Sequence, residues 1–138
     1  MKTYLLTVGR AQPPFREADA HYRKLLSRYQ EVTVVEARDD ADLLRKLPDS
    51  GRVAALDREG RQLDSVAWSR WLDQRRLEAR DLWLLIGGPE GLPAQALEAS
   101  QDRISLGPPT LAHQLARVVV LEQLFRAAKI LAGEPYHL

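Results

Sequence analysis

The stretch of sequence that decides the fold is Leu82-Trp83-Leu84-Leu85-Ile86-Gly87-Gly88-Pro89-Glu90-Gly91-Leu92. Its first half is a continuous apolar run without a polar face, which is typical of a central strand in a sheet covered on both sides. In open α/β sheets, ligands bind beyond the carboxyl ends of such strands, where this sequence has Gly87, Gly88 and Gly91. Glycines there let a ligand reach the backbone, although a tight strand-to-helix turn without a ligand explains the same residues.

Outward from this strand, β-rich and helical segments alternate along the chain. The expected strands are residues 4–8, 32–35, 52–57, 81–86 and 103–106, and the expected helices are residues 15–29, 40–47, 64–80, 93–99 and 111–132. We expect the chain to leave the third strand through a turn at Glu59-Gly60. We also expect Asp64 or Ser65 to be the N-cap of the next helix. This alternation predicts an α/β fold with a mainly parallel sheet, helices on both faces, and one domain spanning residues 1–138.

Composition narrows the class of protein. The 138 residues carry 20 basic and 19 acidic side chains, a net charge of +1, so any RNA site has to be a local patch. The sequence has no Cys, which excludes disulfides and thiolate metal sites and suits a reducing cytosol. No apolar stretch approaches the roughly 20 residues of a membrane span. The three His residues lack metal-ligand spacing, so we expect no metal site. The lack of Cys and of a membrane span leads us to expect a cytoplasmic protein with no membrane contact.

The last expected helix contains four consecutive apolar residues, Val118-Val119-Val120-Leu121, which surround the helix instead of forming one stripe. A second surface must cover them, either by deep burial inside the monomer or by contact with another copy of the chain. We favour a self-contact, because dimers are the commonest oligomers.

The glycine turn lacks the spacing of the familiar nucleotide-binding loops. Gly87-Gly88-Pro89-Glu90-Gly91 does not match G-x-G-x-x-G and is not followed by Gly-Lys-Ser/Thr, and the sequence has no G-x-S-x-G. A Rossmann dinucleotide site, a P-loop and an α/β-hydrolase are therefore disfavoured. His113, beside the expected ligand loop, and His137, beside Tyr136, stay candidates for chemistry.

Two long motifs resemble the SPOUT-class methyltransferases that modify N3 of a pseudouridine in 23S ribosomal RNA. The first is residues 84–92, and the second runs from Ser105-Leu106 through residues 110–118 and 122–127 to Gly133-Glu134-Pro135-Tyr136-His137. Leu5-Leu6-Thr7-Val8-Gly9 and Leu56-Asp57 fit as well, so the resemblance spans the whole chain. It implies a C-terminal trefoil knot, a homodimer, S-adenosylmethionine as cofactor, and 23S rRNA in the large subunit or assembled ribosome as substrate.

The resemblance also implies site residues. By position, the cofactor contacts are Leu56 at the end of the third strand, Gly87 in the glycine turn, and Leu106, Gly107, Pro108, Pro109, Thr110 and Leu111 in the loop before the last helix. The Gly107-Pro108-Pro109 loop lacks serine side chains, so backbone contacts are expected there. His137 is the candidate base, Arg117 the candidate cation or phosphate anchor, and Tyr136 the candidate stacking partner of the target base. Glu90 is a weaker catalytic candidate, because it can simply cap the following helix.

Two other functions stay open. The first is a catalytically inactive RNA-binding protein of the same knotted fold, against which stand the intact Gly87-Gly88 turn and the Tyr136-His137 tail. The second is a flavodoxin-like or receiver-like domain, but those folds place their ligand chemistry after early strands. Calorimetry with S-adenosylmethionine and with FMN discriminates between these functions.

Overall fold

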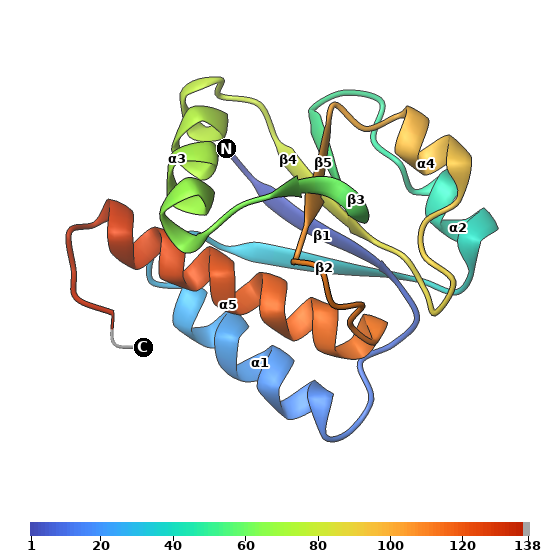
Figure 1. The fold of residues 1–138 in the computed structure, drawn as a ribbon, viewed down its shortest axis with the longest axis horizontal. Helices are drawn as coiled ribbons and strands as arrows, with labels where there is room; N and C mark the ends of the chain where they lie inside the picture. The colour runs from blue at the N-terminus through green and yellow to red at the C-terminus, as the bar shows by residue number, and fades with distance from the viewer. Residues whose placement is uncertain (137–138) are drawn as a thin grey trace.

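A computed structural model describes residues 1–136 and contains a parallel sheet in the order β2-β1-β4-β3-β5 (Figure 1). Its strands are β1 (Thr3–Val8), β2 (Val32–Ala37), β3 (Arg52–Gln62), β4 (Leu82–Ile86) and β5 (Asp102–Ser105). Strand β4 lies between β1 and β3, and Leu82, Leu84 and Leu85 are fully buried. The prediction of a central strand covered on both faces is therefore confirmed.

The helices cover both faces of the sheet, as the alternating pattern predicts. Helices α1 (Phe15–Leu26), α3 (Ser65–Leu77) and α5 (His113–Leu131) pack on the face of Leu84, while α2 (Asp40–Arg45) and α4 (Ala94–Glu98) pack on the face of Leu85. Figure 1 shows α1 and α5 side by side across the first face. The expected α/β class is thus confirmed.

The expected end of the third strand is wrong, because β3 continues to Gln62. Leu56 and Arg61 both pair with Ile104 of β5, so the residues between them bulge out of the ladder before the strand resumes. A Cβ on Gly60 would lie 2.5 Å from the carbonyl carbon of Arg103, so glycine permits this close approach. The polar segment that reads as an exit turn is therefore a bulge within a longer strand.

Local signals set the helix ends and part of the burial. Asp64 caps α3, since its side chain accepts a hydrogen bond from the Ala67 amide at 2.8 Å. Of the four consecutive apolar residues in α5, Val120 and Leu121 are fully buried in the monomer, whereas Val118 and Val119 are half-buried. Burial within the monomer therefore accounts for two of the four residues.

Candidate active site

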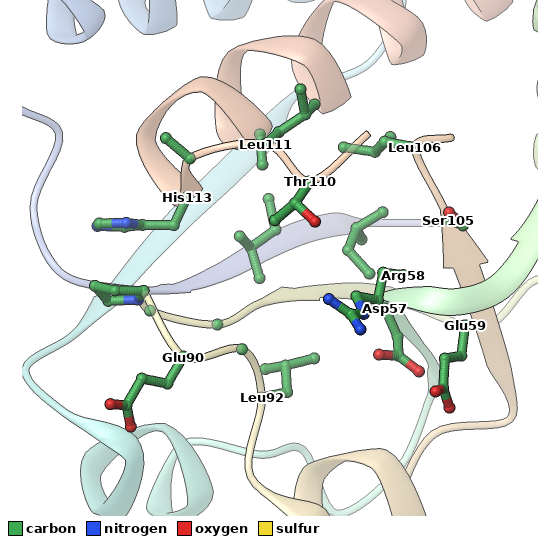
Figure 2. Close-up of a pocket in the computed structure, with 18 of the residues that line it drawn as sticks. Asp57, Arg58, Glu59, Glu90, Leu92, Ser105, Leu106, Thr110, Leu111 and His113 are labelled. Atoms are coloured by element: carbon green, nitrogen blue, oxygen red, sulfur yellow. The ribbon is translucent and has the colours of Figure 1, made fainter. Parts of the chain in front are cut away.

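A pocket of about 660 Å³ opens at the carboxyl ends of β4 and β5, beside the middle of β3 and the first turn of α5 (Figure 2). It is built from the β3 bulge, the glycine turn after β4, and the loop between β5 and α5. This is the edge of the sheet at which the sequence predicts a ligand site. The loop begins with a tight turn, in which the Ser105 hydroxyl accepts from the Gly107 amide and donates to the Gly107 carbonyl, both at 3.1 Å.

The structure brings together most of the expected cofactor-binding residues. Those that line the pocket are Leu56, Gly87, Leu106, Gly107, Pro109, Thr110 and Leu111. Pro108 is not among the lining residues and is exposed. His113, the first residue of α5, lines the pocket as its place in the sequence suggests. Binding of a cofactor by these residues stays a prediction.

Gly87 is required by the turn itself. The residue is buried, and a Cβ on it would collide with the carbonyl carbon of Gly91 and lie 2.6 Å from the Leu92 nitrogen. The turn is closed by a hydrogen bond from the Gly91 amide to the Gly88 carbonyl at 3.0 Å. Of the two explanations for the glycine run, the tight turn accounts for Gly87 through its close contacts and for Gly91 through its φ of +85°, which favours glycine.

Charged side chains at the pocket mouth were missed by the sequence analysis. Asp57, Arg58 and Glu59 come from the β3 bulge, and Figure 2 shows their side chains beside those of the other lining residues. Their signal in the sequence is a polar run at the end of a buried strand, of which Asp57 is predicted to lie in the strand and Glu59 in the exit after it. With Glu90 these residues give the pocket three carboxylates and one guanidinium.

The floor of the pocket is apolar. It includes Ile86, Ile104 and Ala116 from three different elements, next to the expected residues Leu56 and Leu106. Apolar side chains with exposed backbone suit an aromatic heterocycle, and carboxylates at the mouth suit a positively charged group. Within residues 1–136 there is no group of three or more His, Asp or Glu side chains placed to hold a metal ion.

Arg117, the candidate cation or phosphate anchor, lies apart from this pocket and is paired with side chains of other elements. Its side chain is 3% exposed, lies outside the pocket lining, and pairs with Asp19 at 2.9 Å and Glu36 at 2.8 Å. Burial would raise the pKa of Glu36, but hydrogen bonds from Arg117 and the Ala11 amide outweigh it and hold that pKa below its usual 4.5. The guanidinium also donates to Thr7 and to the Gly9 carbonyl, so it joins α5 to α1, β1 and β2.

The two C-terminal candidates lie apart from the pocket or outside the described chain. Tyr136 is half-buried against α5, where its hydroxyl donates to Glu122 at 3.1 Å. His137 lies outside the described residues. None of the helices in the described part of the chain combines the length and hydropathy needed to cross a membrane.

Comparison with known proteins agrees with this arrangement. Residues 1–137 match the family described as "Predicted SPOUT methyltransferase". The chain is 39% identical to ribosomal RNA large subunit methyltransferase H of Xanthomonas oryzae pv. oryzae (strain PXO99A), with 99% of each chain covered. It is 38% identical to the protein of that name from Xanthomonas campestris pv. campestris (strain B100), again with 99% of each covered.

Two solved structures share the fold at low sequence identity. A methylase family protein from Neisseria gonorrhoeae superimposes with a TM-score of 0.60 at 14% identity, covering 99% of this chain and 86% of that one. A methylase family protein from Haemophilus influenzae Rd KW20 gives a TM-score of 0.57 at 10% identity, covering 99% and 70%. The full-length match to the family and the identity of 39% to curated relatives establish that this chain belongs to the SPOUT methyltransferase family.

Proposed function

We propose that this chain is a single-domain, S-adenosylmethionine-dependent methyltransferase that methylates N3 of a pseudouridine in 23S ribosomal RNA. The observation that carries the proposal is the pocket, which brings the glycine turn after β4 together with the loop before α5 at one edge of the sheet. Relatives named for large-subunit rRNA methylation cover 99% of the chain, which supports an rRNA substrate in the large subunit or assembled ribosome.

The residues of the pocket fit the cofactor. Leu56, Ile104 and Leu106 offer an apolar surface for adenine, while Asp57 and Glu59 offer negative charge to the ammonium and sulfonium groups. When bound, S-adenosylmethionine supplies a methyl group that its sulfonium already activates as an electrophile. The protein's contribution is therefore to hold donor and acceptor in line and to exclude other geometries.

The acceptor nitrogen carries a proton that must leave as the bond from N3 to the methyl carbon forms and the bond from carbon to sulfur breaks. His137 is the proposed base for that proton, and Tyr136 is the proposed stacking partner of the pseudouridine. Arg126 lies over one face of the Tyr136 ring at 4.0 Å, so a base would stack on the opposite face. Arg117 is not part of this proposal, because its donors are engaged by Asp19 and Glu36.

A homodimer would bring Tyr136 of one subunit to the cofactor pocket of the other. The pocket lies at the start of α5 near His113, whereas Tyr136 contacts Glu122, nine residues farther along the helix. At 1.5 Å per residue this separates the two by about 14 Å along the helix axis. We propose that the tail of one subunit serves the pocket of the other, and that the half-buried Val118 and Val119 lie at the dimer contact.

Two finer features belong to the same proposal. Membership of the family supports a trefoil knot formed by the segments around the pocket, which a crystallographic trace of residues 80–120 tests. An rRNA substrate implies action in the cytoplasm, which cell fractionation tests.

Calorimetry and a methylation assay test the function directly. We expect S-adenosylmethionine to bind with micromolar affinity, on the order of −8 kcal/mol, and FMN not to bind. Ribosomal subunits lacking the modification should gain one methyl group on a 23S pseudouridine, mapped by mass spectrometry of RNA fragments. A chain that binds RNA and transfers no methyl would instead favour the catalytically inactive alternative. Deleting residues 136–138 should depress turnover and leave cofactor affinity unchanged.

A further inference from the structure

The chain after α5 turns back and is fixed to the helix at a first carboxylate, Glu134 (Figure 1). Gly133, with φ of +70°, makes the turn, and the Glu134 amide donates to the Lys129 carbonyl at 3.0 Å. The Glu134 side chain accepts from the hydroxyl of Tyr29 and from the ammonium of Lys129, both at 3.0 Å. The base of the tail is therefore tied to α5 and to the segment that follows α1.

A second carboxylate, Glu122, holds the end of the described tail. One of its oxygens, Oε1, accepts from the Tyr136 hydroxyl at 3.1 Å and from Arg126 Nε at 3.0 Å and Nη2 at 2.7 Å. The Arg126 guanidinium also lies over the Tyr136 ring at 4.0 Å, and the Phe125 and Tyr136 rings form a T-shaped pair with centroids 5.4 Å apart. Tyr136 is thus held at its hydroxyl, by a cation over one ring face and by a second aromatic ring.

The Glu122 carboxylate is itself held in one orientation. Its other oxygen, Oε2, accepts from the Gln123 amide at 2.7 Å, and the Gln123 carbonyl accepts from the Ser65 hydroxyl at 2.9 Å. Ser65 is the first residue of α3, so the chain of hydrogen bonds reaches a second helix. The side chains of Glu122 and Arg126 are each only 17% exposed, which limits competition from water.

We propose that Glu122 is a positioning residue for methyl transfer, which presents Tyr136 in the orientation the reaction needs. The inference rests on the proposed function, because it takes Tyr136 as the stacking partner of the target base. A Tyr136 side chain that is held in place before RNA arrives spares the enzyme the conformational entropy of ordering it during the reaction. Burial, and then the charge of Glu122, raise the pKa of Tyr136 above its usual 10.0, so the phenol keeps the proton it donates.

A double-mutant cycle separates positioning from simple stabilisation. We expect Glu122→Ala to lower kcat on unmodified ribosomal subunits by at least tenfold, with KM for RNA and the dissociation constant of S-adenosylmethionine within twofold of wild type. Tyr136→Phe removes only the hydroxyl that Glu122 holds, so it should lower kcat as well. If Glu122 acts through that hydroxyl, the double variant should be no slower than the slower single variant.

Two further variants serve as rescue and control. Glu122→Gln keeps an oxygen that accepts from Tyr136 and Arg126, so it should recover much of the lost kcat. Asp73→Ala removes a helical carboxylate whose partner, Arg76, lies 4.0 Å away with both side chains about half exposed, and it should leave kcat unchanged. Circular dichroism and thermal melts verify that each variant is folded at the assay temperature.

The outcomes distinguish this inference from the function on which it rests. Wild-type kcat in Glu122→Ala, or losses that multiply in the double variant, would overturn the positioning role while leaving methyl transfer intact. A wild-type chain that neither binds S-adenosylmethionine nor methylates rRNA would contradict the proposed function and this inference together. Equal losses of kcat in Glu122→Gln and Glu122→Ala would show that the charge of Glu122, and not its hydrogen bonding, matters, and would also contradict the inference.

Discussion

Gly87 and Gly88 are neighbours in the sequence with different steric surroundings. A Cβ on Gly87 would strike the backbone of Gly91 and Leu92, whereas the nearest atom to a Cβ on Gly88 is a methyl carbon of Val8 at 3.4 Å. We expect Gly87→Ala to destabilise the protein by about 1–3 kcal/mol because the backbone of the turn must move. Gly88→Ala is the matched control and should change the free energy of unfolding by less than about 0.5 kcal/mol.

Urea denaturation of the two variants measures this difference. Gly87→Ala should also weaken S-adenosylmethionine binding, because the displaced turn forms one wall of the pocket. Equal stability of the two variants would mean that the turn tolerates a side chain at either position, contrary to the packing described above.

We expect the ion pairs of Arg117 to contribute to the stability of the folded protein. Arg117→Met leaves Asp19, which is 3% exposed, without its main partner, so the free energy of unfolding should fall by roughly 3–5 kcal/mol. Arg23 lies 3.9 Å from the same carboxylate with its side chain 44% exposed, and Arg23→Ala should cost less than about 1 kcal/mol. Denaturation curves of both variants test the pair, and equal small losses would contradict the buried role of Arg117.

At the scale of elements, one carboxylate joins β5 to β3 and α3. Asp102 accepts from Arg52 at 2.7 and 3.1 Å and from Arg75 at 3.4 Å. Burial would raise the pKa of Asp102, but the hydrogen bonds and charge of Arg52 outweigh it and keep that pKa below its usual 3.8. Because the folded-state pKa is lowered, the stabilisation is complete above the unfolded-state pKa and is lost as pH falls through the folded-state value.

Asp102→Asn tests this dependence on pH. Wild type should lose stability below about pH 4, and the variant should lose less over the same range because the group no longer titrates. The free energy of unfolding from urea titrations between pH 3 and 7 gives the comparison. Parallel curves for the two proteins would show that Asp102 does not contribute to acid sensitivity.

Val120 and Leu121 of helix α5 are buried in the monomer, whereas Val118 and Val119 are half-buried. The proposed dimer contact therefore involves Val118 and Val119. Val119→Glu should place a charge in the proposed interface and give a monomer in sedimentation velocity at micromolar concentration. Leu77, which is 80% exposed at the end of α3, provides the control, since Leu77→Glu should leave the dimer intact. A wild-type monomer at that concentration would remove the dimer from the proposal.

At the scale of the whole molecule, the fold class could be predicted from the sequence and some details could not. The alternation of apolar strands and helices gives the layers, because periodicity records which face of each element is buried. The length of β3 could not be predicted, since pairing with β5 overrides the turn signal at Glu59-Gly60. The ion pairs of Arg117 could not be predicted either, because Asp19 is 98 residues away in the chain.

The candidate site, like the fold, could be predicted from the sequence only in part. The glycine turn and the loop before α5 are visible in the sequence because they are local motifs. The carboxylates of the β3 bulge enter the pocket through long-range strand pairing, so the polar run after the buried strand does not by itself place them there. The placement of Tyr136 at Glu122 depends on how the tail turns at Gly133, which spacing alone does not determine.

Binding of the cofactor should stabilise the entire fold, since its pocket joins three strands and one helix. With S-adenosylmethionine at 100 times its dissociation constant, we expect about 2.7 kcal/mol of added stability. A thermal shift that grows with S-adenosylmethionine concentration, and does not appear with FMN at the same concentrations, checks this. The absence of any shift at millimolar S-adenosylmethionine would contradict the assignment of the pocket.

The order of the strands has a consequence for how the protein comes into being. Strand β1 is synthesised before the other strands described here, yet it lies inside the sheet and cannot complete its pairing until β4 has been made, whose residue Leu82 pairs with Thr3. The pocket is completed later still, when His113 and Ala116 of α5 have been added. A nascent chain therefore lacks the complete pocket until α5 has been translated. Under the proposed function, the ribosome that makes this protein is not exposed to methyl transfer by the nascent chain before that point.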